Sequence, residues 1–128
     1  MIDEKIRTFT DLRTWQEGHK LVLQIYKVTE QFPRSEQFGL TSQMRRCVVS
    51  ITSNIAEGFG RMSKKEKIRF YYISAGSLTE LYNQVIISKD VGMINEGSYL
   101  KLIEQITTVQ KLTHGLIRSI KATRLDAN

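Results

Sequence analysis

The side chains best suited to chemistry in this sequence lie between Phe38 and Arg61. Ser50, Asn54 and Glu57 follow one another at steps of four and three, which places them on one face of a helix. A catalytic role would require a base beside a nucleophile, and none is evident near them. Buried or interfacial polar groups must find hydrogen-bond partners. The row is therefore predicted to fix the register between helices or subunits.

The other groups that could act as nucleophiles, bases or ligands are isolated. His19 and His114 lie far apart without partners at ligand spacing, and His19 falls in an apolar row where a packed, hydrogen-bonded imidazole is expected. Cys47 stands in an apolar run with no histidine near it, which indicates a buried, inert thiol. There is no Glu-x-x-His pair for a di-iron centre and no glycine-rich phosphate loop. The sequence therefore predicts a protein that is not an enzyme and has no metal or cofactor.

The composition is that of a basic globular domain. The chain has 128 residues, which suits one domain, and 41% of them are hydrophobic, which is enough to build a core. Nineteen lysines and arginines against thirteen acids give a net charge of +6, which favours polyanions such as nucleic acid. A single cysteine excludes an internal disulfide, and neither a signal peptide nor a spanning segment is visible. We expect a cytoplasmic protein without membrane association.

Hydrophobic periodicity predicts four helices, at about residues 11–31, 41–57, 63–90 and 98–124. Pro33 is expected to end the first helix, and Gly58 and Gly60 to cap the second. The run from Ser63 to Glu66 has the pattern of a capping box at the start of the third helix. No strand signal of comparable strength occurs.

Short connections make neighbouring helices antiparallel, so the predicted fold is an all-α, up-down-up-down four-helix bundle. The third helix also carries apolar residues largely outside its main stripe, namely Phe70, Ile73, Leu81, Ile86 and Ile87. Because a bundle helix needs only one apolar face, this excess favours burial against another subunit. A homo-oligomer is therefore predicted, with a broader core within one chain as the alternative.

The same topology gathers basic residues at one end of the bundle, where the first and third helices begin and the second and fourth end. Cations in the last turn of the fourth helix offset the negative end of its dipole. Cations at the start of the third helix have no such role, and the free amides there suit anions. A phosphate site and a solvated surface both fit this pattern. The predicted nucleic-acid-binding residues are Arg61, Lys64, Lys65, Lys67, Arg69, Arg118, Lys121 and Arg124, with Arg45 and Arg46 on another face or in an oligomer's channel.

Several short motifs, taken together, resemble one protein family over nearly the whole chain. They are Asp11-Leu12 with Trp15-Gln16 and His19, Phe38 to Gln43 with Arg45-Arg46, Ser53 to Gly58, Gly76-Ser77-Leu78 with Glu80-Leu81, and Leu116 to Ser119. In this order they resemble the bacterial 23S rRNA intervening-sequence protein family. Three sites depart from the pattern: Thr52 stands where many relatives carry proline, Gly18 replaces a small helix former, and Tyr82-Asn83 stands where an acidic residue is common.

The resemblance implies a four-helix bundle that often assembles as a homopentamer, and it implies no enzymatic activity. Some relatives are encoded within large-subunit rRNA genes. Others, the accessory variability proteins of diversity-generating retroelements, bind nucleic acid and a reverse transcriptase through basic surfaces. The resemblance thus implies RNA or DNA, and a reverse transcriptase, as partners.

Two hypotheses follow for the function. The first is a non-enzymatic homo-oligomer that binds structured RNA or DNA by shape and charge, since no base-reading module is visible. The second is an adaptor or structural oligomer that binds a protein. A small-molecule enzyme would require a deep pocket around Asn54 and Glu57.

Overall fold

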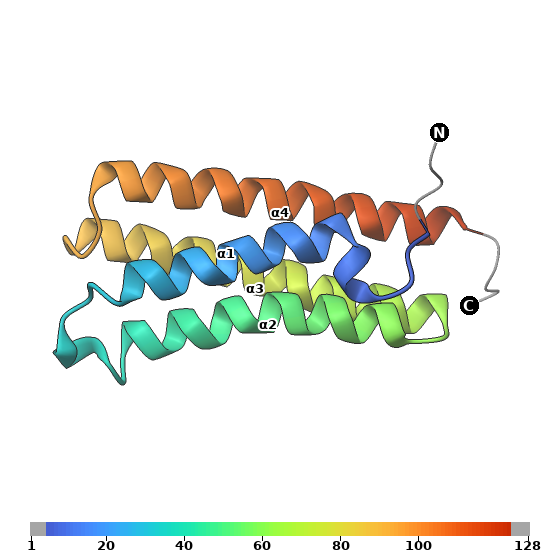
Figure 1. Ribbon diagram of the computed structural model, residues 1–128, viewed down its shortest axis with the longest axis horizontal. Helices are drawn as coiled ribbons and strands as arrows, with labels where there is room; N and C mark the ends of the chain where they lie inside the picture. Colours follow the sequence, from blue (N-terminus) through green and yellow to red (C-terminus); the bar gives the residue numbers. More distant parts are fainter. Residues whose placement is uncertain (1–4, 124–128) are drawn as a thin grey trace.

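The computed structural model describes residues 5–123, and this part of the chain is helical apart from short connections (Figure 1). In chain order, its helices are the 3-10 helix η1 (Phe9–Asp11), α1 (Arg13–Thr29), the 3-10 helix η2 (Arg34–Glu36), α2 (Leu40–Gly60), α3 (Lys64–Asp90) and α4 (Glu96–Ala122). Residues 5–123 contain no strand. The all-α class predicted from the sequence is confirmed.

Successive long helices run in opposite directions. α1 and α3 each pack against both α2 and α4, so the four helices close a ring around one core. The predicted up-down-up-down topology is therefore confirmed. As a consequence, the beginnings of α1 and α3 and the ends of α2 and α4 meet at one end of the bundle (Figure 1).

The first helix is shorter than predicted because a separate 3-10 turn precedes it. A capping box forms η1: the Thr8 hydroxyl accepts the N–H of Thr10, and the Asp11 carboxylate accepts the N–H of Thr8 at 3.0 Å. Leu12 is then extended before α1 begins at Arg13. α1 ends at Thr29, ahead of the proline that was expected to end it.

The second helix is longer than predicted, because Gly58 and Gly60 lie inside α2 rather than capping it. The prediction of a glycine cap is wrong for a steric reason. Gly58 is buried against α3, and a Cβ atom at that position would lie 2.7 Å from Cε1 of Tyr71. The glycine therefore permits close approach of two helices, and α2 ends one residue before Arg61.

The third and fourth helices begin at polar caps. The Ser63 hydroxyl accepts the N–H of Glu66 at 3.1 Å, which confirms the serine half of the predicted capping box. The Asn95 side chain accepts the N–H of Ser98 at 2.8 Å. Between the two helices, Gly92 has a φ of 82°, a left-handed conformation that glycine adopts without steric cost.

The core contains aliphatic side chains from all four long helices. Its fully buried members include Leu21, Ile25, Met44, Ile51, Ile55, Leu78, Leu81, Val85, Ile106 and Val109. Buried hydroxyls are satisfied by main-chain carbonyls. Ser74 donates to the carbonyl of Ile51 across the α2–α3 seam at 2.9 Å, and Thr113 donates to Val109 within α4 at 2.7 Å.

The apolar excess of α3 divides into three parts in the structure. Leu81, expected outside the main stripe, is fully buried in the core of this chain, so that assignment is wrong. Phe70 is half-buried beneath two arginines, and Ile86 is half-buried as well. Ile73 and Ile87 are each 41% exposed and remain available for a partner. The homo-oligomer stays a prediction.

Gly18 and Thr52, two of the departures from the family pattern, lie in contact between α1 and α2. A Cβ atom at position 18 would stand 3.1 Å from Cγ2 of Thr52. The threonine methyl thus occupies space left free by the glycine, and α2 runs without interruption through Thr52.

We expect Gly58→Ala to lower the free energy of unfolding by about 1–3 kcal/mol, because the new methyl group would overpack against Tyr71. Gly76→Ala is a matched control on the exposed side of α3, where nothing lies within 4 Å of the added atom. It should raise the free energy of unfolding by about 0.5–1 kcal/mol through helix propensity. Urea unfolding followed by circular dichroism measures both, and an increase in the free energy of unfolding at both positions would contradict the close packing of Gly58.

Candidate nucleic-acid interface

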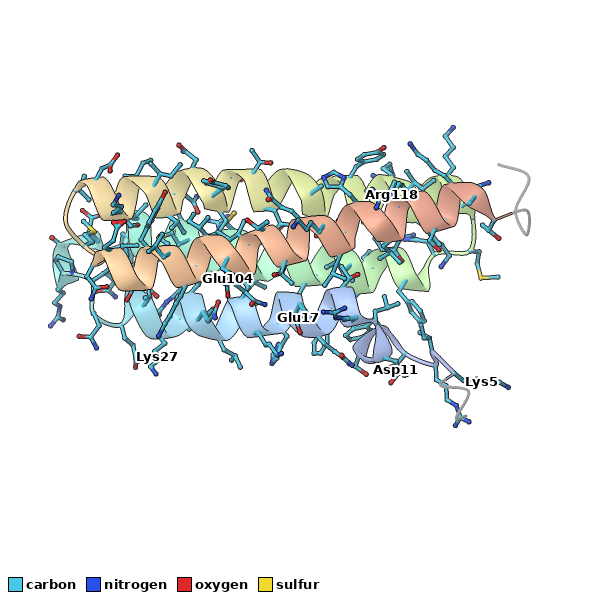
Figure 2. The ribbon with its side chains drawn as sticks, turned by 90° about the horizontal axis from the view of Figure 1, so that it is seen from above. Lys5, Asp11, Glu17, Lys27, Glu104 and Arg118 are labelled. Carbon is cyan, nitrogen blue, oxygen red and sulfur yellow. The ribbon has the colours of Figure 1, made fainter. Side chains whose placement is uncertain are left out.

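The basic end of the bundle is where the fold brings most of the predicted phosphate-binding residues together. α2 ends there, α3 begins there after a short connection, and α4 ends beside them. Figure 2 shows Lys5 and Arg118 toward this end, with Lys27 toward the other. Arg124, predicted to belong to this group, lies outside the described residues.

Lys67 caps the carboxyl end of α2. Its ammonium group donates to the carbonyl oxygen of Phe59 at 2.7 Å and to that of Gly58 at 3.5 Å. These carbonyls belong to the last turn of the helix, where the backbone supplies few donors. The carbonyl of Gly58 also accepts the N–H of Arg61 at 3.2 Å. Burial lowers the pKa of Lys67. The Lys67 ammonium group is therefore already bound to main-chain carbonyls of the same molecule.

Lys64 and Lys121 also make contacts between α3 and α4. Lys64 donates to the carbonyl oxygen of Thr123 at 2.7 Å, which ties the start of α3 to the end of α4. Lys121 donates to the hydroxyl of Tyr72 at 2.9 Å and lies 5.3 Å from the centre of that ring. Lys121 is exposed, so its charge still faces solvent.

Arg61 and Arg69 share two partners. Both guanidinium groups lie over the ring of Phe70, at 4.7 and 4.5 Å from its centre. Both also approach Glu66, at 3.9 and 3.2 Å, and Arg61 pairs with Glu57 at 2.9 Å. These carboxylates offset part of the positive charge of the cluster, although such exposed pairs add little stability.

Lys65 and Arg118 differ from the other basic side chains at this end. Both are exposed, and within residues 5–123 neither has a hydrogen-bond or ion-pair partner. Arg118 is on α4 and Lys65 is on the first turn of α3. These two cations are therefore free to meet an anion without breaking a contact of the fold.

Arg45 and Arg46 lie away from this end and differ from each other. Arg45 donates to the hydroxyl of Thr29 at 2.8 Å and to the carbonyl of Tyr26 at 3.3 Å, and so caps the end of α1. Its guanidinium lies 4.6 Å from the centre of the Tyr26 ring. Arg46 is exposed and borders two shallow grooves, one on each side of α2.

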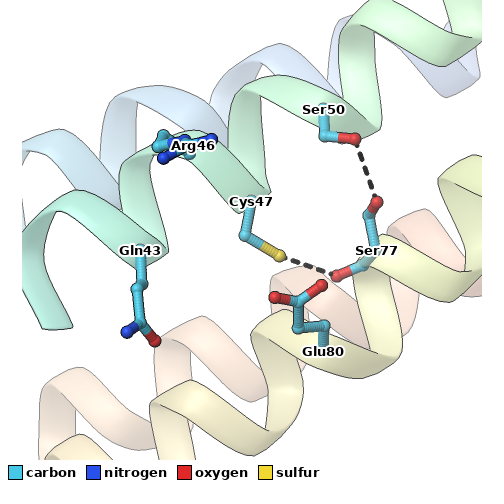
Figure 3. Close-up of a pocket in the computed structure, with 6 residues that line it drawn as sticks. All are labelled: Gln43, Arg46, Cys47, Ser50, Ser77 and Glu80. Carbon is cyan, nitrogen blue, oxygen red and sulfur yellow. Dashed lines mark hydrogen bonds between the residues drawn. The ribbon is translucent and has the colours of Figure 1, made fainter. Parts of the chain in front are cut away.

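The polar row of α2 meets α3 at one of these grooves (Figure 3). The hydroxyls of Ser50 and Ser77 lie 3.0 Å apart, and Asn54 donates to the carbonyl of Ser50 at 2.8 Å. The Cys47 thiol donates to the carbonyl of Ser77 at 3.1 Å. Ser77 was not identified from the sequence as a partner of this row, since nothing in its local spacing marks it. Glu57, the third member, pairs with Arg61 instead.

This groove has no nucleophile ready for catalysis. It measures about 320 Å³ and is lined by Gln43, Arg46, Cys47, Ser50, Ser77 and Glu80. Burial raises the pKa of the Cys47 thiol to about 12, so the thiol stays protonated near neutral pH. Within the described part of the chain, no group of three histidine, cysteine or acidic residues could hold a metal ion.

His19 is stacked rather than hydrogen-bonded. Its imidazole lies nearly parallel to the indole of Trp15, with ring centres 4.8 Å apart, and Phe9 meets the indole edge-on at 5.5 Å. His19 and Tyr26, which lie seven positions apart on one side of α1, are both exposed. The residues that α1 buries are Thr14, Gly18, Leu21, Ile25 and Thr29.

The arrangement of the helices and the basic end of the bundle define the class of protein. It is an antiparallel four-helix bundle with a cationic end. The model of the 23S rRNA-intervening sequence protein family matches residues 10–115. The chain belongs to this family. Among its described residues, none of the helices is long and apolar enough to cross a membrane.

A solved structure shares the fold. It is a protein of unknown function from the S23 ribosomal protein family of Bacteroides thetaiotaomicron VPI-5482, with a TM-score of 0.76 and 18% sequence identity. The similarity covers 82% of this chain and 95% of that chain. At this identity the likeness shows the fold alone. No curated protein matches the sequence.

We expect Lys67→Met to lower the free energy of unfolding by about 1–3 kcal/mol, because two helix-end carbonyls lose a charged donor. Lys65→Met removes the same charge two residues earlier, where the side chain is exposed and unpartnered, and should change stability by less than about 0.5 kcal/mol. Thermal unfolding of the two variants measures the difference. Similar losses of unfolding free energy in both variants would show that removal of a positive charge, rather than removal of the cap of α2, lowers the stability.

The Cys47 thiol should react slowly with a thiol reagent at about pH 8 in the folded protein and fully in denaturant. Its folded pKa of about 12 lies above the unfolded value near 9.0. The stability contributed by the neutral thiol is therefore fully present below about pH 9 and is lost as pH rises toward 12. Rapid labelling of the native protein at the lower pH would contradict the burial of this residue.

Proposed function

We propose that this protein is a non-enzymatic, homo-oligomeric bundle that binds structured nucleic acid through its basic end. The observation that carries the proposal is the pair of exposed, unpartnered cations, Lys65 and Arg118, at an end where four helix termini meet. The net charge of +6 and the description of the family as rRNA-intervening sequence proteins support it.

Lys65 and Arg118 would make the primary phosphate contacts, because no internal bond has to break when they turn toward a phosphate. Lys121 and Arg69 are exposed as well and would add charge while keeping their present partners. Lys67 would act differently, by holding the end of α2 in place. Binding would depend on shape and charge rather than on sequence.

A protein partner is the second candidate. Ile73 and Ile87 of α3 are exposed apolar side chains, and Val49 of α2 is 39% exposed. Such side chains suit a protein contact or a subunit contact better than a phosphate contact.

The test is binding of the purified protein to a labelled RNA hairpin and to a DNA duplex at about 50 and 200 mM salt. We expect tight binding at the lower salt that weakens steeply at the higher. Replacing Lys65 and Arg118 together by glutamine should weaken binding at least about tenfold and reduce the slope of log affinity against log salt by about 2.

Replacement of Lys27 and Lys101 by glutamine is the matched control. Both lysines are exposed, they border a groove where α1 ends and α4 begins, and the net charge falls by the same amount. Equal losses in the two double variants would assign binding to bulk charge rather than to the basic end. Absence of binding by the unaltered protein at low salt would defeat the proposal and favour a protein partner.

A further inference from the structure

One flank of α1 carries a row of rings at the margin of the core: Trp15 packs partly against the core, and His19 and Tyr26 are exposed. Trp15, His19 and Tyr26 follow one another at steps of four and seven, which places them on the same side of the helix. Trp15 is half-buried, His19 is exposed and Tyr26 is 41% exposed. The contact between Gly18 and Thr52 places α2 next to this flank. The rings therefore lie along the outer side of the α1–α2 seam.

At one end of this flank, the rings are already stacked. The imidazole of His19 lies over the indole of Trp15 at 4.8 Å with an angle of 13° between the planes, while Phe9 supports the indole edge-on. Within the described residues, His19 has no hydrogen-bond partner. The stack thus ends in an exposed flat ring, which is the surface on which a nucleobase stacks.

At the other end, a ring and two guanidinium groups line a groove of about 400 Å³ between α1 and α2. Its lining residues are Tyr26, Arg45, Arg46, Val49, Ser50 and Ser53, and none of them carries a carboxylate. Arg45 is fixed against the ring by its bonds to α1, whereas Arg46 is exposed and free. Guanidinium planes and aromatic rings both accept stacked bases. A free guanidinium beside them suits a phosphate.

The spacing of the two ends matches a short run of nucleotides. Seven residues separate His19 from Tyr26, which corresponds to about 10 Å along a helix. Stacked nucleotides repeat at about 3.4 Å along a strand, so the flank spans roughly three of them.

We infer that the α1–α2 flank binds unpaired nucleotides of a nucleic acid, by stacking of bases on His19 and Tyr26 and by contact of a phosphate with Arg46. The inference rests on the proposed function and assigns a second contact surface to it. Unpaired bases are the fitting ligand because a double helix hides the faces of its bases, whereas a loop or single strand exposes them. The basic end would then hold the structured part of the same molecule.

The test compares two probes that differ only in their bases. One is a labelled oligothymidylate of about 15 nucleotides, within the length that one single-strand-binding fold covers. The other is an abasic sugar-phosphate oligomer of equal length and charge. At about 50 mM salt, we expect tighter binding of the oligothymidylate. Trp15 is the only tryptophan in the chain, so its fluorescence should be quenched by the first probe and not by the second.

Tyr26→Leu should weaken binding of the oligothymidylate by about 5- to 150-fold, the range found for loss of one stacking ring, and leave the abasic oligomer unaffected. Tyr26→Phe keeps the aromatic ring, so this variant should still bind the oligothymidylate more tightly than the abasic oligomer. His19→Ala should abolish the quenching of Trp15. Tyr72→Leu is the matched control, because it removes an exposed ring beneath a lysine on another face. It should leave the ratio of the two affinities unchanged.

Four outcomes would overturn the inference. Equal affinity for the two probes, or equal changes of the ratio in Tyr26→Leu and Tyr72→Leu, would exclude stacking on this flank while the proposed function stands. A change of oligomeric mass in Tyr26→Leu, measured by light scattering, would make the flank a subunit contact instead. Failure of the unaltered protein to bind either probe, the RNA hairpin or the duplex would overturn the proposed function as well.

Discussion

The close packing of α3 against α2 sets the positions of the polar and basic side chains along both helices. Gly58 lets Tyr71 approach the α2 backbone, and the Ser74 hydroxyl donates to the carbonyl of Ile51 at 2.9 Å. Farther along the seam, the hydroxyls of Ser50 and Ser77 meet at 3.0 Å. A buried hydroxyl without a partner costs free energy, so these contacts fix the register of the two helices as well as their separation.

That register sorts the basic side chains into two groups. The first turn of α3 folds back beside the last turn of α2, where carbonyl groups lack helical donors. Lys67 reaches these carbonyls and is held by them, and Arg61 is drawn toward Glu66 and Phe70. Lys65 projects away from the seam and stays exposed. The basic end therefore has an inner layer that completes the fold and an outer layer that faces solvent, although both consist of the same residue types.

α1 shows the same difference between side chains that complete the fold and side chains that face solvent. Its sequence contains two rows of apolar and aromatic residues, and periodicity alone gives no reason to prefer either as the buried one. The row with Leu21 and Ile25 enters the core, because Gly18 lets that side approach Thr52 of α2. The row with His19 and Tyr26 is left at the edge of the seam. Trp15 and Val22 of this row pack partly against the core, whereas His19 and Tyr26 are exposed.

The helices, the bundle and the family could be predicted from the residues alone, because periodic apolar residues, caps and short motifs are local signals. The limits of α3 were predicted to within one residue, and Ser63 caps it as expected. The tertiary structure alone decided the role of Gly58, the partner of Ser50, the burial of Leu81 and which lysines and arginines stay free. Each of these depends on contact between residues distant in the chain, and neither spacing nor composition records which helix will lie opposite a given side chain.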